Sequence, residues 1–123
     1  HDMYIKKSHT FTAPAFNHDE VEKPPKDSVL LASDKINKFM ALQFSVGKSE
    51  IWGLQYHPEI PYDYMIKLIK YRSEALLSKK IFKYEDDLNK HIQAIEKARS
   101  ILKYEERTLE LKNWLTFIKK NKQ

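Results

Sequence analysis

Hydrophobic residues are distributed differently on the two sides of Pro61. Before Pro61, apolar residues form short runs separated by polar stretches with Gly, Pro and Asp, a pattern typical of buried β-strands. The predicted strands are residues 29–33, 39–44 and 51–56. Residues 45–50 are polar and contain Gly47, so we predict a turn there that joins the last two strands in a hairpin. Residues 4–13 are also rich in β-prone side chains.

Beyond Pro61, apolar residues recur every three or four positions, which is the spacing along one face of an α-helix. Proline suits the first turn of a helix, because its missing N–H has no partner there. We predict one helix from Pro61, a second over about residues 85–102 and a third over about residues 105–120. The apolar stripes that we expect to be buried are Met65, Leu68, Ile69 and Leu76, then Leu88, Ile92, Ile95 and Leu102, and finally Leu111, Trp114, Leu115 and Ile118.

This order of elements indicates an α/β fold, with residues 1–61 as the sheet region and residues 62–123 as a helical tail that packs on the sheet. The three apolar stripes need a surface to cover them. A sheet of this class normally needs cover on both faces, and so short a chain offers few elements for that purpose. The pattern is a first hint that part of the domain lies outside this sequence.

The composition is that of a folded domain, with 41% hydrophobic and 32% charged residues. The chain has no cysteine, so it has no disulfide, no thiolate metal site and no cysteine nucleophile of its own. Absence of cysteine is compatible with the cytoplasm, which is where we expect the protein. No run of about 18 apolar residues is present, and the first residues lack the apolar core of a secretory signal, so we expect no membrane association.

Positive charge is concentrated in the helical part: residues 62–123 carry 15 Lys and Arg against 9 Asp and Glu, and the whole chain has a net charge of +5. A basic region can bind nucleic acid or an acidic partner. Here the lysines alternate with acidic residues along the predicted helices, as on solvated helix faces. No set of aromatic and arginine side chains for base stacking is recognisable, so we do not expect a nucleic-acid partner.

The segment with most chemical content is residues 52–59, where an apolar strand ends in His57 and Glu59 follows two positions later. In extended backbone, residues two apart point to the same side of a strand. Pro58 favours an extended conformation for the residue before it. Glu59 can then orient the imidazole of His57, which is the combination of base and orienting carboxylate found in nucleophilic triads. A histidine and a glutamate at this spacing are by themselves a weak signal.

The sequence on both sides of His57 and Glu59 is a more specific signal than the pair alone. Residues 53–59, Gly-Leu-Gln-Tyr-His-Pro-Glu, resemble the closing G-x-Q-F/Y-H-P-E motif of class I glutamine amidotransferases. Upstream, His18-Asp19-Glu20-Val21, Pro24-Pro25 and Leu30-Leu31-Ala32-Ser33 resemble that family's H-x-D-x-V…P…LA-S passage. Here the aspartate follows the histidine directly, so no role is carried over to His18. The resemblance covers roughly residues 4–72, and more loosely the tail around Ile69–Arg72, Arg107 and Asn113–Leu115.

The resemblance implies the C-terminal part of a flavodoxin-like, three-layer amidotransferase domain. In that family a cysteine attacks the side-chain amide of glutamine, a histidine acts as base and then acid, and a glutamate orients the histidine. Only His57 and Glu59 carry over as catalytic residues. The cysteine elbow, a G-x-C-x-G-type motif, is absent, since the chain has no cysteine and its glycines are Gly47 and Gly53. We therefore predict that this chain alone does not hydrolyse glutamine, and we expect no cofactor.

The partners that follow are glutamine as the family's substrate and, as protein partners, the missing N-terminal half, a synthase subunit or a second copy of the chain. The alternative is a catalytically inactive amidotransferase-like fragment that serves as a protein-interaction module.

Two further readings carry less weight. A metal site would have to draw on His1, His9, His18 or His57, but none of these has a partner at helical metal-ligand spacing and no thiol is present. Ligand stacking by Trp52, Tyr56 or Trp114 is also conceivable, but packing is the commoner role of such rings.

Overall fold

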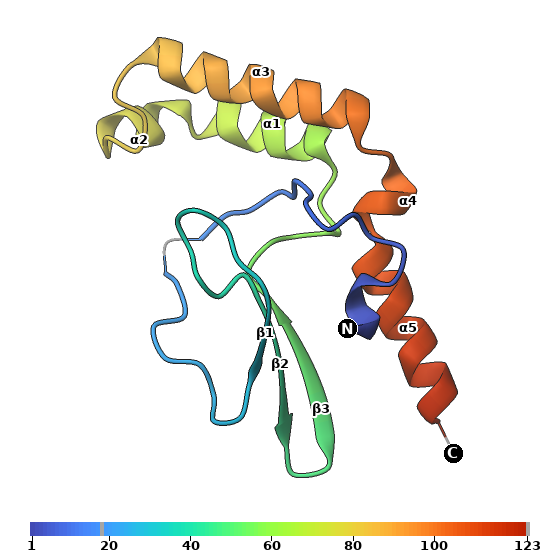
Figure 1. Cartoon of the computed structure of the whole chain (residues 1–123). Coiled ribbons are helices and arrows are strands. Elements are labelled where there is room, and N and C mark those ends of the chain that lie inside the picture. The colour runs from blue at the N-terminus through green and yellow to red at the C-terminus, as the bar shows by residue number, and fades with distance from the viewer. Residues whose placement is uncertain (18, 123) are drawn as a thin grey trace.

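The computed structural model describes residues 1–17 and 19–122 and shows one small sheet with helices around it (Figure 1). In chain order the elements are η1 (Asp2–Tyr4, a 3₁₀ helix), β1 (Val29–Ala32), β2 (Ala41–Val46), β3 (Ser49–Leu54), α1 (Tyr62–Tyr71), α2 (Ser73–Ser78), α3 (Glu85–Ile101), α4 (Tyr104–Arg107) and α5 (Leu109–Asn121). The chain is therefore α/β, as predicted. The flavodoxin-like, three-layer arrangement stays a prediction, because flavodoxin-like folds are built around a parallel sheet and the three strands here pair antiparallel.

The sheet has the strand order β1-β2-β3, and its central feature is the predicted β2–β3 hairpin. Ala41 lies opposite Leu54 and Val46 lies opposite Ser49, so the turn has only two residues. The predicted turn over residues 45–50 was too long. Gly47 has a φ of +60°, which a residue without Cβ adopts readily, and a positive φ at this position is a feature of tight hairpin turns. Ser45, Ser49 and Glu50 are polar but belong to the strands, because the exposed ends of strands tolerate polar side chains.

Residues 4–13 form no strand, contrary to their β-prone composition. Tyr4 ends the 3₁₀ helix, and Lys6 has a φ of 65°, a left-handed conformation that interrupts extended backbone. Beyond this segment, Ala15 forms an isolated antiparallel bridge with Tyr56, two residues after β3. Aromatic side chains that suggested a strand, such as Phe11, instead pack against the sheet from a loop.

The helices α1 and α3 form an antiparallel pair with its own core. The buried side chains of this helical core are Tyr62, Met65, Ile66, Ile69, Leu88, Ile92 and Ile95. Five of them belong to the first two predicted stripes, which are thus confirmed at those positions. The helix predicted from Pro61 is broken after Tyr71, and α2 follows at Ser73. The second predicted helix is confirmed as α3, whose first turn holds three acidic residues.

The third predicted helix differs most from its prediction. It is split into α4 and α5, and its expected buried stripe is exposed: Leu111, Trp114, Leu115 and Ile118 have 38%, 45%, 52% and 38% of their surface accessible. The opposite face packs instead against η1, where Asn113 donates hydrogen bonds to the carbonyls of Met3 and Ile5 at 2.9 and 3.0 Å. Periodicity identified the helix correctly, but only the neighbouring N-terminal segment decided which face is covered.

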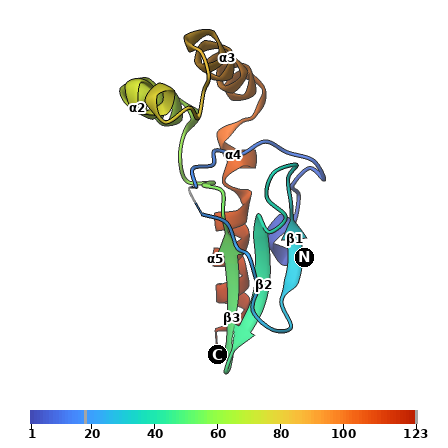
Figure 2. The ribbon, with the colours of Figure 1, turned by 90° about the vertical axis from the view of Figure 1, so that its left-hand side faces the viewer.

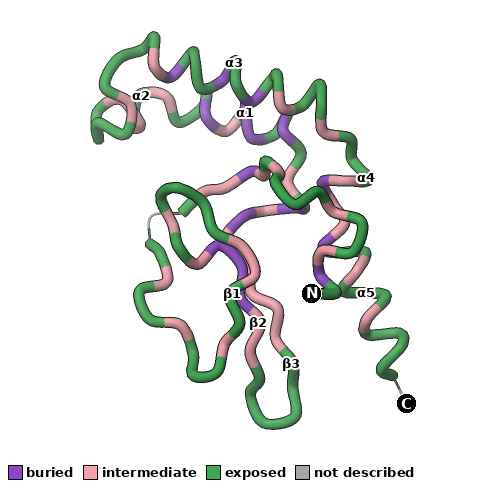
Figure 3. The backbone as a smooth tube through the Cα atoms, viewed as in Figure 1, coloured by how far each residue is buried: buried purple, intermediate pink, exposed green. Residues whose placement is uncertain are grey.

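A second core, the sheet core, lies between the sheet and the N-terminal segment and is built on Met3, Met40, Ala41 and Tyr56. Figure 3 shows the two cores as separate groups of buried residues, one between α1 and α3 and one at the sheet. The helix α5 runs along the sheet (Figure 2), and the rings of Trp52 and Phe117 pack there with centroids 5.0 Å apart.

The division into residues 1–61 and 62–123 stays a prediction. None of the helices in the described ranges is long and apolar enough to cross a membrane.

Candidate functional site

The candidate site is built on the tight turn that follows β3. β3 ends at Leu54, and the backbone N–H of His57 donates to the carbonyl of Pro14 at 2.7 Å. The turn over residues 57–60 is closed by a hydrogen bond from the Ile60 N–H to the His57 carbonyl at 3.3 Å. Pro58 suits the second position of such a turn, because its φ is already restricted to the required range. His57 is thereby held at the end of the strand by a crossing segment on one side and by a turn on the other.

The imidazole and the carboxylate of this turn are in direct contact. His57 Nδ1 lies 2.8 Å from Glu59 Oε1. The side chains are 37% and 55% exposed, so the pair faces solvent and is not enclosed in a core. The contact predicted from an extended backbone is present, but a turn and not an extended strand brings the two groups together. A carboxylate that accepts from Nδ1–H leaves the Nε2 lone pair free to accept a proton.

The charge of Glu59 is stabilised by its neighbours. Partial burial of the carboxyl acts to raise its pKa, but the hydrogen bonds from His57 and from its own backbone N–H, and the charges of His57 and Arg107, together hold the pKa of Glu59 below its usual range. Arg107 reaches this turn from α4, and its Nη1 donates to the carbonyl of Pro58 at 2.5 Å. Glu59 is therefore an anion over the whole neutral range, as an orienting carboxylate must be.

The turn lies where the two cores meet. Tyr56, directly before His57, is part of the sheet core, and Ile60, shortly after it, packs on the helical core. The Phe16 ring, which also packs on the helical core, lies with its centroid 6.0 Å from that of His57. Phe16 therefore lies beside the imidazole, while 37% of the His57 side chain stays exposed.

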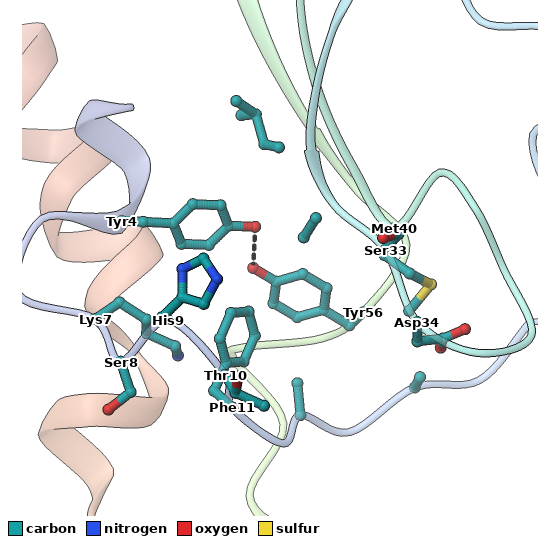
Figure 4. A pocket seen from close by; sticks show the side chains of 14 residues that line it. Tyr4, Lys7, Ser8, His9, Thr10, Phe11, Ser33, Asp34, Met40 and Tyr56 are labelled. Carbon is teal, nitrogen blue, oxygen red and sulfur yellow. Dashed lines mark hydrogen bonds between the residues drawn. The ribbon is translucent and has the colours of Figure 1, made fainter.

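An open cavity of about 660 Å³ lies beside the sheet core (Figure 4). The hydroxyls of Tyr4 and Tyr56 share a hydrogen bond of 2.9 Å in its wall. Burial is the main cause that raises the pKa of Tyr4 to about 12, and burial also raises the pKa of Tyr56. Both phenols are therefore neutral at physiological pH. His57 and Glu59 do not line this cavity, so it is a separate feature from the candidate site.

A buried ion pair that the sequence does not predict includes Lys7, one of the residues that line the cavity. Lys7 Nζ lies 2.7 Å from Glu110 Oε1, and the two side chains are only 1% and 2% exposed. Within the described ranges, the Lys7 ammonium is the one positively charged group within ion-pair distance of the Glu110 carboxylate. Lys7 stands in the polar stretch of residues 6–10, and Glu110 stands between Leu109 and Leu111 in a predicted helix. No local signal marks either charged side chain as buried. The sequence connects Arg107 only with the tail that resembles the amidotransferases, and no residue near it in the chain indicates contact with the turn.

The remaining candidates are scattered over the molecule. His1 lies 3.8 Å from Glu50, His9 lines the cavity, and His18 falls outside the described residues. In the part of the chain that the structure describes, no three His, Asp or Glu side chains converge as metal ligands would. Tyr56 is buried, Trp52 packs between His1 and Phe117, and Trp114 is exposed.

Comparison with known proteins gives a partial match. Over 60 residues the chain is 35% identical to a gamma-glutamyl-L-1-hydroxyisopropylamide hydrolase of Pseudomonas sp. The match takes in 49% of this chain and 20% of the relative, so the chain spans about a fifth of the length of the curated protein it matches. No family model matches the chain, and no solved structure matches it. The chain is thus similar over half its length to an enzyme that hydrolyses a γ-glutamyl amide.

Proposed function

We propose that this chain supplies the base and its orienting carboxylate to the active site of a γ-glutamyl amide hydrolase of the class I glutamine amidotransferase type. The observation that carries the proposal is the 2.8 Å contact between His57 Nδ1 and Glu59 Oε1, within the Gly-Leu-Gln-Tyr-His-Pro-Glu segment. The partial similarity to a hydrolase of a γ-glutamyl amide supports the same reaction class.

In the proposed reaction a cysteine thiol from polypeptide outside this sequence is the nucleophile. His57 takes the thiol proton at Nε2, and the sulfur adds to the amide carbon of the substrate. The imidazolium, stabilised by Glu59, returns the proton to the leaving nitrogen as the C–N bond breaks, which releases the amine or ammonia and leaves a γ-glutamyl thioester. His57 then deprotonates a water that attacks the thioester, which releases glutamate and restores the thiol.

The substrate class follows from the bond that is broken. Glutamine and the amide named for the relative both carry a γ-glutamyl group in amide linkage. They differ only in the leaving nitrogen, which is ammonia in one and an amino alcohol in the other. We expect the base to serve either, because protonation of the leaving nitrogen is the same step in both.

The test uses the polypeptide encoded by this sequence together with the reading frame upstream of it. Release of ammonia from glutamine and of amine from γ-glutamyl alkylamides is measured for this polypeptide and for the 123-residue chain. We expect activity in the extended polypeptide when it contains a cysteine, and none in the chain alone. His57→Ala lowers kcat on the order of 10⁴-fold or more, and Glu59→Gln lowers it about 10²- to 10⁴-fold.

His91→Ala and Glu74→Gln are the matched controls, because both residues are exposed on helices away from the turn. Activity in the extended polypeptide that survives His57→Ala would refute the assignment. Hydrolysis of glutamine by the cysteine-free chain itself, lost on His57→Ala, would refute the need for an external thiol.

A second candidate function is that of a protein-interaction module, which the exposed apolar face of α5 favours. A set of four large apolar side chains with 38–52% exposure on one helix is typical of a surface that another polypeptide covers. Analytical ultracentrifugation of the chain over a range of concentrations tests this function. Self-association that is lost in the Trp114→Gln variant would support it, and a monomer at all concentrations that does not bind the upstream polypeptide would contradict it.

A further inference from the structure

Arg107 is buried although its side chain is always charged. Only 6% of its surface is exposed, and charged side chains are rarely buried to this degree without a specific partner. Its hydrogen bond goes to the backbone carbonyl of Pro58, which lies between His57 and Glu59 in the chain. No carboxylate of the described residues lies within ion-pair distance of its guanidinium, which lies over the Tyr104 ring, 5.3 Å from the centroid, and donates to this carbonyl.

The short helix that carries Arg107 is anchored from outside. The Glu106 carbonyl accepts a hydrogen bond from Lys7 Nζ at 2.9 Å, and the Glu106 carboxylate accepts one from Ser8 Oγ at 2.8 Å. The next helix is tied to the same N-terminal segment by the two hydrogen bonds of Asn113 and by the buried ion pair of Glu110. The helix α4, which carries the guanidinium, is therefore held in place by the N-terminal segment.

The bonded carbonyl controls the geometry of the candidate pair. Proline restricts φ of residue 58 and also restricts the backbone of His57 before it, so the freer rotations between His57 and Glu59 are ψ of Pro58 and φ of Glu59. Rotation about ψ turns the carbonyl of Pro58 and the peptide that leads into Glu59 together. A group that holds this carbonyl therefore removes one of the two freer rotations that set the direction in which the Glu59 side chain leaves the backbone.

We propose that Arg107 is a positioning residue for the candidate site: by fixing the Pro58 carbonyl it keeps the Glu59 carboxylate on His57 Nδ1. The proposal rests on the proposed role of His57 and Glu59. If Arg107 has this role, α4 contributes to the geometry of the candidate site. The N-terminal segment contributes as well, because it holds α4. Arg107 touches no reacting atom; it acts through the turn, and its charge also helps to hold the pKa of Glu59 below its usual range.

The test measures which nitrogen of His57 carries the proton, by nitrogen NMR of the full chain labelled on histidine. The measurement is made at alkaline pH, where imidazoles are neutral, and the hydrogen bond of a ring nitrogen selects the tautomer. In the unmodified chain we expect the Nδ1–H form to predominate. In Arg107→Met we expect the hydrogen bond between His57 Nδ1 and Glu59 to be lost. The ratio of Nδ1–H to Nε2–H should then fall about fivefold, the factor that corresponds to the net free energy of one hydrogen bond. Arg107→Lys keeps the charge but not the planar fork and should give a smaller fall of about twofold.

Arg99→Met is the control, because Arg99 is an exposed arginine that pairs with Asp63 and does not contact the turn. An unchanged tautomer ratio in a folded Arg107→Met chain overturns the inference. If that variant does not fold, the same ratio in Arg107→Lys decides, and an unchanged value again overturns it. Absence of the Nδ1–H form in the unmodified chain is a different result, since it contradicts the His57–Glu59 pair and with it the proposed function.

Discussion

At the scale of single residues, the chemistry of the candidate site depends on how firmly the Glu59 carboxylate stays ionised beside His57. The two side chains contact each other through Nδ1 and Oε1, and both are partly exposed. Solvent screens such a pair, so its contribution to folding stability is small. Its importance lies in orientation: a carboxylate on Nδ1 fixes the tautomer in which Nε2 can act as a base.

Replacement of His57 by alanine should raise the pKa of Glu59 toward its usual value. The variant lacks the hydrogen bond and the positive charge that lower this pKa. Because the folded-state pKa is the lower one, the stabilising effect of the pair is fully present above the usual carboxyl pKa and is lost as pH falls through the lowered value. Carbon NMR of the glutamate carboxyls over pH 2–7 (roughly the range around the reference glutamate pKa) measures the shift.

The matched control for this titration is His91→Ala, which removes a histidine from the exposed face of α3. It should leave the Glu59 titration in place. An identical Glu59 midpoint in His57→Ala and the unmodified chain would mean that the 2.8 Å contact is not populated in solution.

At the scale of elements, the α1–α3 pair behaves as its sequence pattern suggests. Ile92 is 7% exposed in the middle of the helical core, whereas its neighbour Gln93 is exposed. We expect Ile92→Ala to lower the free energy of unfolding by about 2–4 kcal/mol, because it removes apolar contacts and leaves a cavity. Gln93→Ala, one position away, should change it by less than about 0.5 kcal/mol. Urea unfolding followed by circular dichroism checks both, and equal effects would contradict the assigned faces.

The helix α5 should behave in the opposite way. Its apolar stripe was predicted to be core, yet Leu115 is 52% exposed. Leu115→Gln should therefore change the stability of the isolated chain by less than about 0.5 kcal/mol, in contrast to the several kcal/mol expected for a core leucine. The same urea experiment measures it. A large loss of stability in the monomer would show that this face is covered in solution.

At the scale of the whole molecule, a buried ion pair joins the N-terminal segment to the C-terminal helix α5. Lys7 and Glu110 join the N-terminal segment to α5, and both side chains are almost inaccessible. Removal of one partner from such a pair leaves the other charge buried and uncompensated, which costs about 3–5 kcal/mol. We expect a loss of that size for Lys7→Met in urea unfolding.

The double variant Lys7→Met/Glu110→Leu tests the cause of that loss. Replacement of both charges by apolar groups of similar size should recover most of the stability, because a buried ion pair adds little over a packed apolar pair. If the double variant is as unstable as Lys7→Met, the loss comes from the hydrogen bond that Lys7 donates to the Glu106 carbonyl and not from the stranded carboxylate.

The sequence by itself determined the features whose causes lie within a few residues. The α1 and α3 faces follow from helical spacing, the β2–β3 hairpin from two apolar runs around Gly47, and the proximity of His57 and Glu59 from their spacing across a proline. Only the tertiary structure decided the exposed face of α5, the buried Lys7–Glu110 pair and the reach of Arg107 to Pro58. Those features depend on which distant segment lies beside a helix, and periodicity, propensity and charge pattern carry no information about such neighbours.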